Sequence, residues 1–227
     1  MTQFTGESYL QSMMGHGLRA ASQAELVEKL VSRGFLVAPE EIITTFRNVD
    51  RAKFLPASAT DEYSNAPQKL VESHFMSTPQ LHSQIISLLA SRLGPGRIAS
   101  EIGCGSGYLP AVMATMECDS VVAVERDPEL LEISRKNLKT LPNVKVSDNI
   151  PPGTVLDALY ISAYFASESA LDSFLSHISF SADAVVVASV KDLSDGPLCD
   201  QQLVLLERSM SGWSRTNLFR VLCELLS

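Results

Sequence analysis

Three glycines alternate with small residues in the stretch EIGCGSGYLP, which spans residues 101–110. An apolar run precedes this stretch and a helical pattern follows it, so we predict a turn between a strand and a helix. A glycine-rich turn in that position lets the backbone approach a ligand closely, and the N-terminus of the following helix carries partial positive charge. This turn is therefore the strongest candidate for a cofactor-binding segment.

The spacing of the glycines separates two classes of nucleoside cofactor. Dinucleotide-binding turns have the pattern G-x-G-x-x-G, whereas Gly103, Gly105 and Gly107 give G-x-G-x-G and are followed by Tyr108. Glu125 ends the next predicted strand, where a carboxylate can bind both hydroxyls of a ribose. Alone, such a turn can be only a tight connection, and such a glutamate only a surface charge. Together they favour S-adenosylmethionine over a dinucleotide.

Strand and helix patterns alternate around this turn. Short apolar runs at RIASEI, VVAVE, LDALYI and AVVVAS are separated by helical segments that begin at Tyr108, Pro128 and Ser167. This alternation is typical of βαβ units, so we predict a doubly wound, mostly parallel Rossmann-like α/β sheet. The runs QQLVLLERS and LFRVLCELL, joined by SGWSRTN, are predicted to form a C-terminal antiparallel strand pair.

The first 75 residues have a different pattern. Helices are predicted from Ala20 to Gly34 and from Pro39 onward, and the segment from Phe54 to Val71 is irregular. We therefore divide the chain into an N-terminal helical lobe with its connecting segment, residues 1–75, and a cofactor-binding domain, residues 76–227.

The composition limits the class of protein. The formal net charge is −8 and no block of basic residues occurs, so the positive surface that binds nucleic acid is missing. No apolar stretch approaches the roughly 18 residues of a membrane span, and the N-terminus lacks a secretory signal pattern. The cysteines lack CxxC spacing and the histidines lack metal-ligand spacing. We expect a cytoplasmic monomer with free thiols and no metal, nucleic-acid or membrane partner.

Several motifs resemble one methyltransferase family. RIASEIGCGSGYLPAVMA and VVAVERDPELL resemble the first two strand–helix units of protein-L-isoaspartate O-methyltransferases, which use S-adenosylmethionine. VDRAKFLPASATDEYSNAPQKL resembles the segment before that family's active site, and MSTPQLHSQIISLL resembles its Ser-x-Pro element. The motifs occur in the family's order. The resemblance implies methyl esterification of L-isoaspartyl residues in damaged proteins or peptides, which is a protein-repair activity.

The resemblance also implies roles for individual residues. Ser77 corresponds to the family's active-site serine, whose hydroxyl would position the acceptor carboxylate. A carboxylate has an ordinary pKa of about 4, so it attacks a sulfonium methyl group without a general base. The implied cofactor-binding residues are Glu101, Gly103, Cys104, Gly105, Ser106, Gly107, Glu125, Arg126, Asp148 and Asn149. Two of the residues have structural alternatives, because Ser77 can cap the helix beginning at Pro79 and Asp148 can form an Asx turn.

Four segments depart from the family pattern. The family's Gln-x-Thr before its serine falls on Ser73 and Phe75, and its Gly-Asp-Gly falls on residues 147–149. Residues 181–183 and 188–190 replace Pro-Gly-Gly and Pro-Val-Gly. These departures leave two other functions open. The chain can be a catalytically impaired protein that binds the cofactor and a protein partner, or a methyltransferase with a different acceptor.

Overall fold

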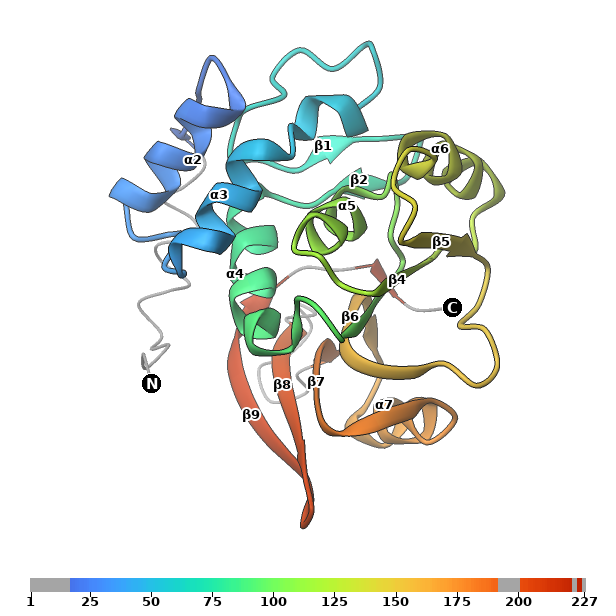
Figure 1. The fold of residues 1–227 in the computed structure, drawn as a ribbon. Coiled ribbons are helices and arrows are strands. Elements are labelled where there is room, and N and C mark those ends of the chain that lie inside the picture. Colours follow the sequence, from blue (N-terminus) through green and yellow to red (C-terminus); the bar gives the residue numbers. More distant parts are fainter. Residues whose placement is uncertain (1–16, 192–200, 222–223, 226–227) are drawn as a thin grey trace.

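The structure is a computed structural model that describes residues 17–191, 201–221 and 224–225 (Figure 1). Within these ranges the main sheet has the strand order β5-β4-β3-β6-β7-β8-β9, and β10 pairs with β6. Neighbouring strands from β5 to β7 are parallel, while β7, β8 and β9 are antiparallel to one another. The strands are β3 (Ile98–Ile102), β4 (Ser120–Val124), β5 (Val144–Ser147), β6 (Val155–Phe165), β7 (Ser179–Lys191), β8 (Gln201–Ser209), β9 (Gly212–Val221) and β10 (Glu224–Leu225). The predicted doubly wound sheet with a C-terminal antiparallel pair is confirmed.

The predicted boundary of the last strand is wrong. SGWSRTN was expected to be a turn, but β9 begins at Gly212, and only Met210 and Ser211 separate it from β8. Gly212 has a φ of 112°, which allows so short a connection. Most of SGWSRTN is therefore strand.

Helices cover both faces of the sheet. The main ones are α2 (Gln23–Ser32), α3 (Glu40–Asn48), α4 (Pro79–Leu89), α5 (Tyr108–Thr115), α6 (Pro128–Leu138) and α7 (Glu168–Leu175), with 3₁₀ turns η2 (Arg51–Phe54) and η3 (Ala90–Arg92). Local sequence explains their starts: Ser22 accepts the Glu25 N–H at α2, and Asp127 accepts two N–H groups at α6. No helix in the described ranges is both long and apolar enough to cross a membrane.

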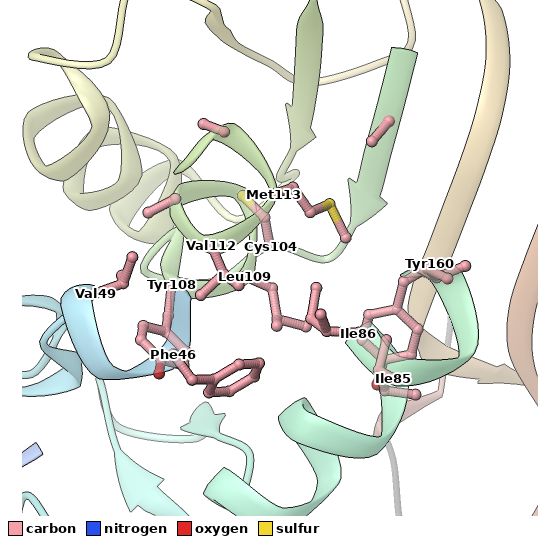
Figure 2. Packing of buried hydrophobic residues seen from close by; sticks show 14 of the residues in the cluster. Phe46, Val49, Ile85, Ile86, Cys104, Tyr108, Leu109, Val112, Met113 and Tyr160 are labelled. Carbon is pink, nitrogen blue, oxygen red and sulfur yellow. The ribbon is translucent and has the colours of Figure 1, made fainter. Parts of the chain in front are cut away.

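One apolar cluster joins the N-terminal helices to the sheet. Phe46 of α3, Ile85 of α4, Val112 of α5 and Tyr160 of β6 belong to it, and Figure 2 shows them facing a common interior. A second cluster, which includes Leu171 of α7, covers the other face. The helices after β3 and β4 thus pack on one face and the helix after β6 on the other. This arrangement puts the topological switch point between β3 and β6, where doubly wound sheets bind ligands.

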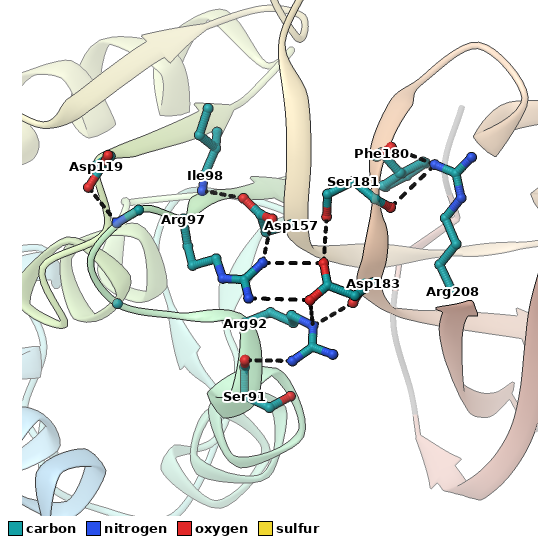
Figure 3. A network of polar contacts seen from close by, with 12 residues as sticks. Ser91, Arg92, Arg97, Ile98, Asp119, Asp157, Phe180, Ser181, Asp183 and Arg208 are labelled. Carbon is teal, nitrogen blue, oxygen red and sulfur yellow. Dashed lines mark hydrogen bonds and ion pairs between the residues drawn. The ribbon is translucent and has the colours of Figure 1, made fainter. Parts of the chain in front are cut away.

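An ion-pair network fastens the ends of the strands opposite the switch-point edge (Figure 3). The Arg97 guanidinium lies 2.9 Å from Asp157 Oδ1 and 3.2 Å from Asp183 Oδ2. Asp157 Oδ2 also accepts the first N–H of β3, from Ile98, at 2.8 Å. The network therefore ties β3 to β6 and β7.

Within this network, we expect Asp157→Ala to lower the free energy of unfolding by about 1–3 kcal/mol, because the Ile98 N–H and Arg97 both lose an acceptor. Asp183→Ala is the matched control, since its side chain is 46% exposed and its loss should cost clearly less than the loss of Asp157. The hydrogen bond from Arg97 lowers the pKa of Asp183, so its contribution is present at neutral pH and disappears on acidification. Urea unfolding measures both variants, and equal losses would contradict this ranking.

Candidate active site

The glycine turn connects β3 to α5 at the switch point. Gly103, Gly105 and Gly107 have φ values of 79°, 55° and 88°, a region that favours glycine. A Cβ at Gly103 would lie 2.6 Å from Ser162 Oγ, and one at Gly107 would lie 2.7 Å from Leu138 Cδ1. Both backbone conformation and lack of space therefore require glycine at these two positions.

The residues between the glycines contribute mainly through their backbone. Cys104 and Ser106 are buried, and burial raises the pKa of the Cys104 thiol well above its ordinary value. The Cys104 N–H donates to the carbonyl of Val124 at 3.0 Å, and the Ser106 carbonyl accepts from Asn137 Nδ2 at 2.9 Å. Thus β4 and α6 hold the turn in shape.

Glu125 binds the glycine turn directly. Its Oε2 accepts the Gly105 N–H at 2.8 Å, and its Oε1 accepts the N–H groups of Arg126 and Asp127 at 2.7 and 3.0 Å. A carboxylate has about four lone-pair positions, so Oε2 can still accept one further bond. To accept hydrogen bonds from both hydroxyls of a ribose, Glu125 must give up one of its three bonds from backbone N–H groups. The Arg126 side chain is exposed, and its backbone N–H is the part that reaches Glu125.

Glu101 lies near the end of β3 and is fully enclosed. Burial, followed by repulsion from Glu125, raises its pKa well above the ordinary value, which disfavours the charged form of the carboxyl. Among the described residues its Oε2 has no hydrogen-bond partner. An unsatisfied carboxyl beneath a glycine turn fits a ligand that brings a positively charged amino group. S-adenosylmethionine carries such a group.

Ser77 does not cap α4. The helix is capped by Thr78, whose Oγ1 accepts the Leu81 N–H at 3.1 Å. Ser77 is half-buried between β2 (Phe75–Met76) and α4. Its hydroxyl makes no hydrogen bond to the described part of the chain. The structural alternative for Ser77 is therefore wrong, and the hydroxyl remains available to a ligand.

A short hairpin brings the Ser77 segment to the glycine turn. It consists of β1 (Gln68–Lys69) and β2, and Figure 1 shows both strands beside α5 and α6. Leu70 Cδ1 lies 3.3 Å from where a Cβ on Gly105 would be, and His74 Nε2 lies 3.7 Å from Asp127 Oδ2. Three segments distant in the sequence thus meet at one edge of the sheet.

Asp148 and Asn149 follow β5 at the same edge. Both are exposed, and Asn149 Nδ2 donates to Asp148 Oδ1 at 2.9 Å. The Asx turn proposed as an alternative would use the Ile150 N–H, and that bond is not formed. The Glu125 N–H donates to the carbonyl of Ser147, the last residue of β5, at 3.0 Å. Asp148 is the next residue along the chain. The two acidic residues therefore occupy neighbouring strand ends.

The sequence analysis missed a buried polar group behind the turn. Arg51 is fully buried, and its guanidinium nitrogens have no hydrogen-bond partner among the described residues. Burial lowers its pKa to about 10, and burial together with Arg51 lowers the pKa of His82 to about 3. Arg51 is thus charged and His82 neutral at pH 7. The sequence feature that could have pointed to this group is the adjacent pair of Asp50 and Arg51 in VDRAKF.

Comparisons with known proteins identify the family of this chain. Residues 21–154 match the family model described as Protein-L-isoaspartate(D-aspartate) O-methyltransferase (PCMT). A protein-L-isoaspartate O-methyltransferase of Caenorhabditis elegans is 31% identical over 121 residues, which are 52% of each chain. One of Methylorubrum populi is 31% identical over 151 residues, covering 63% of this chain and 69% of that relative. The chain spans about half the length of several of the curated relatives it matches.

A solved structure supports the fold. It is a putative protein-L-isoaspartate O-methyltransferase from Plasmodium falciparum in complex with S-adenosyl-L-homocysteine, with a TM-score of 0.77 and 22% identity. The alignment covers 92% of this chain and 99% of that one. The family match includes Ser77, the glycine turn and Glu125, and it extends over more than half of the residues. The chain therefore belongs to the protein-L-isoaspartate O-methyltransferase family.

Proposed function

We propose that this protein transfers a methyl group from S-adenosylmethionine to the free α-carboxylate of L-isoaspartyl residues in damaged proteins or peptides. The observation that carries the proposal is an uncommitted Ser77 hydroxyl that directly follows a hairpin packed on the glycine turn through Leu70 and Gly105. The names of the relatives and the family match support the same acceptor.

When bound, S-adenosylmethionine supplies a methyl group on a positively charged sulfur. The acceptor carboxylate is ionised near neutral pH, so the protein needs to supply alignment and shelter rather than a general base. The Ser77 hydroxyl donates to the acceptor carboxylate and fixes its direction. Glu125 would accept a hydrogen bond from a ribose hydroxyl, Asp148 would accept one from the adenine amino group, and the turn glycines would let the protein backbone approach the cofactor closely. Leu70, packed on Gly105, excludes water.

The remaining assignments have unequal support. The free, buried thiols of Cys104 and Cys118 support a reducing compartment such as the cytoplasm, while Cys199 and Cys223 lie outside the described residues. The net charge of −8 supports a protein partner rather than nucleic acid. The monomeric state, the lack of a membrane partner and the division of the chain after residue 75 stay predictions.

The test compares labelled methyl transfer to an isoaspartyl peptide and to its aspartyl twin, with S-adenosylhomocysteine binding measured by calorimetry in parallel. We expect transfer to the isoaspartyl peptide alone. Cofactor binding without transfer to any carboxylate would identify an impaired binding protein. Transfer to another acceptor with none to the isoaspartyl peptide would identify a methyltransferase of different specificity.

Glu101 provides a separate prediction about pH. Because its pKa is raised in the folded state, the folded protein holds a proton that the unfolded chain releases, and stability falls as pH rises above the ordinary value. Glu101→Gln should therefore raise the melting temperature of the cofactor-free protein at pH 8 relative to wild type, with a smaller gain near pH 4. It should also weaken S-adenosylmethionine binding by about tenfold, since a charged acceptor is lost.

The measurements are thermal unfolding across pH and calorimetry in buffers of different ionisation enthalpy. Wild-type protein should release a proton from Glu101 when the cationic ligand binds, and the variant should not. Identical proton release in the two proteins would contradict this assignment.

A further inference from the structure

The β1–β2 hairpin has a defined pairing. Leu70 N–H donates to the His74 carbonyl at 2.9 Å, and the register pairs Gln68 with Met76 and Lys69 with Phe75. Hydrogen-bonded pairs alternate with non-hydrogen-bonded pairs in antiparallel strands. Because Leu70 and His74 form a hydrogen-bonded pair, the neighbouring pair of Lys69 and Phe75 is a non-hydrogen-bonded one. Side chains are closest in such pairs, which places the stem of Lys69 beside the Phe75 ring.

The two faces of the hairpin differ in exposure. Leu70 and Met76 point inward and are 9% and 4% exposed, whereas Phe75 is 55% exposed and Lys69 is also exposed. An aromatic ring left more than half in water costs free energy that a ligand can recover by covering it. The Lys69 ammonium makes no ion pair with any residue in the described ranges. The outward face thus presents an uncovered ring and an uncommitted positive charge.

This outward face lies next to Ser77 along the chain. Ser77 is two residues beyond Phe75, so the chain between them can span at most about 7 Å. Leu70 and the His74–Asp127 contact hold the hairpin against the glycine turn. The residues that flank an acceptor carboxylate at Ser77 are therefore within reach of Phe75.

We propose that Phe75 and Lys69 select the acceptor peptide by contacting its flanking side chains, so that substrates with apolar and acidic neighbours of the isoaspartyl residue are preferred. This inference rests on the proposed function. The ring of Phe75 buries an apolar flanking side chain, and Lys69 pairs with an acidic one. Ions screen the negative charges that lie more than about 8 Å from Lys69.

The test uses isoaspartyl peptides that differ only at the two positions on either side of the acceptor, with leucine, glycine, glutamate or lysine there. Wild-type kcat/KM should favour leucine over glycine by about tenfold at the responsive position. Phe75→Ala should abolish this preference and Phe75→Leu should retain most of it. Lys69→Ala should reduce kcat/KM for the glutamate peptide by about threefold, and Lys69→Glu should favour the lysine peptide.

Met210→Ala is the matched control. Met210 is another fully exposed hydrophobic residue, but it lies in the β8–β9 turn, at the far end of the molecule from β1 and β2 (Figure 1). It should change no preference. Calorimetry with S-adenosylhomocysteine should give the same affinity for every variant, which shows that the cofactor site is intact.

Two outcomes overturn the inference in distinguishable ways. If wild-type protein methylates all isoaspartyl peptides equally, or if Phe75→Ala reduces transfer to all of them by one factor, the selection by Phe75 is wrong while the proposed function stands. If wild-type protein binds S-adenosylhomocysteine but methylates no isoaspartyl peptide, the proposed function is wrong and the inference falls with it.

Discussion

Replacing Ser77 with alanine is expected to lower kcat/KM for methyl transfer to an isoaspartyl peptide by about 10- to 100-fold, with S-adenosylmethionine affinity nearly unchanged. A hydrogen bond to a charged group contributes about 1.5–3 kcal/mol, and each 1.4 kcal/mol corresponds to a factor of ten in rate. Because the described chain does not use the Ser77 hydroxyl, its loss should leave the free energy of unfolding almost constant. Labelled transfer assays and urea unfolding measure the two quantities.

The neighbouring residue supplies the control. Thr78→Ala removes the side-chain cap of α4 and should cost about 1 kcal/mol of stability, while turnover of the folded protein stays at the wild-type level. The two adjacent variants thus have opposite expected profiles. A Ser77→Ala protein that is destabilised but fully active would show that the serine has only a structural role.

Replacing Glu125 with alanine is expected to weaken S-adenosylmethionine and S-adenosylhomocysteine binding by about 1–3 kcal/mol, which is roughly 5- to 150-fold in Kd. The ribose hydroxyl loses its acceptor, and the Gly105 N–H loses the bond that orders the turn. Glu129→Ala is a suitable control, because Glu129 is an exposed acid in the first turn of α6. Calorimetry gives both affinities.

Unchanged affinity in Glu125→Ala would remove this residue from the cofactor site. A nicotinamide dinucleotide should not bind measurably to the wild-type protein, because the turn lacks the G-x-G-x-x-G spacing. Tight dinucleotide binding would therefore contradict the interpretation of the glycines.

The sequence predicts the sheet and the turn because local patterns determine them. Apolar runs separated by helical segments give the parallel strands, and three alternating glycines mark the positive φ values. The capping residue of α4 was not predictable in this way, since Ser77 and Thr78 both carry a hydroxyl before Pro79. The backbone at Thr78, with φ −62° and ψ 148°, directs its Oγ1 to the Leu81 N–H.

Tertiary contacts decided the other details that the sequence left undetermined. The strand-end position of Glu125 was predicted, but its three bonds to backbone N–H groups depend on how the turn folds against β4. The burial of Arg51 likewise depends on packing between η2 and α5, and periodicity in a four-residue 3₁₀ turn is too short to reveal it. The residue types therefore indicated candidate site residues, whereas the contacts of those residues depend on tertiary packing.

The apolar cluster that joins α3 to β6 has a consequence for how the protein denatures. Its side chains come from residues as far apart as Leu18 and Leu203. Unfolding of the N-terminal helices would therefore expose the inner face of the sheet, and unfolding of the sheet would expose the helices. Heat should therefore melt both in one cooperative transition, with calorimetric and van't Hoff enthalpies in agreement. A truncation that begins at residue 76 would leave the inner faces of α4 and α5 in water and would aggregate rather than persist as an independent sheet.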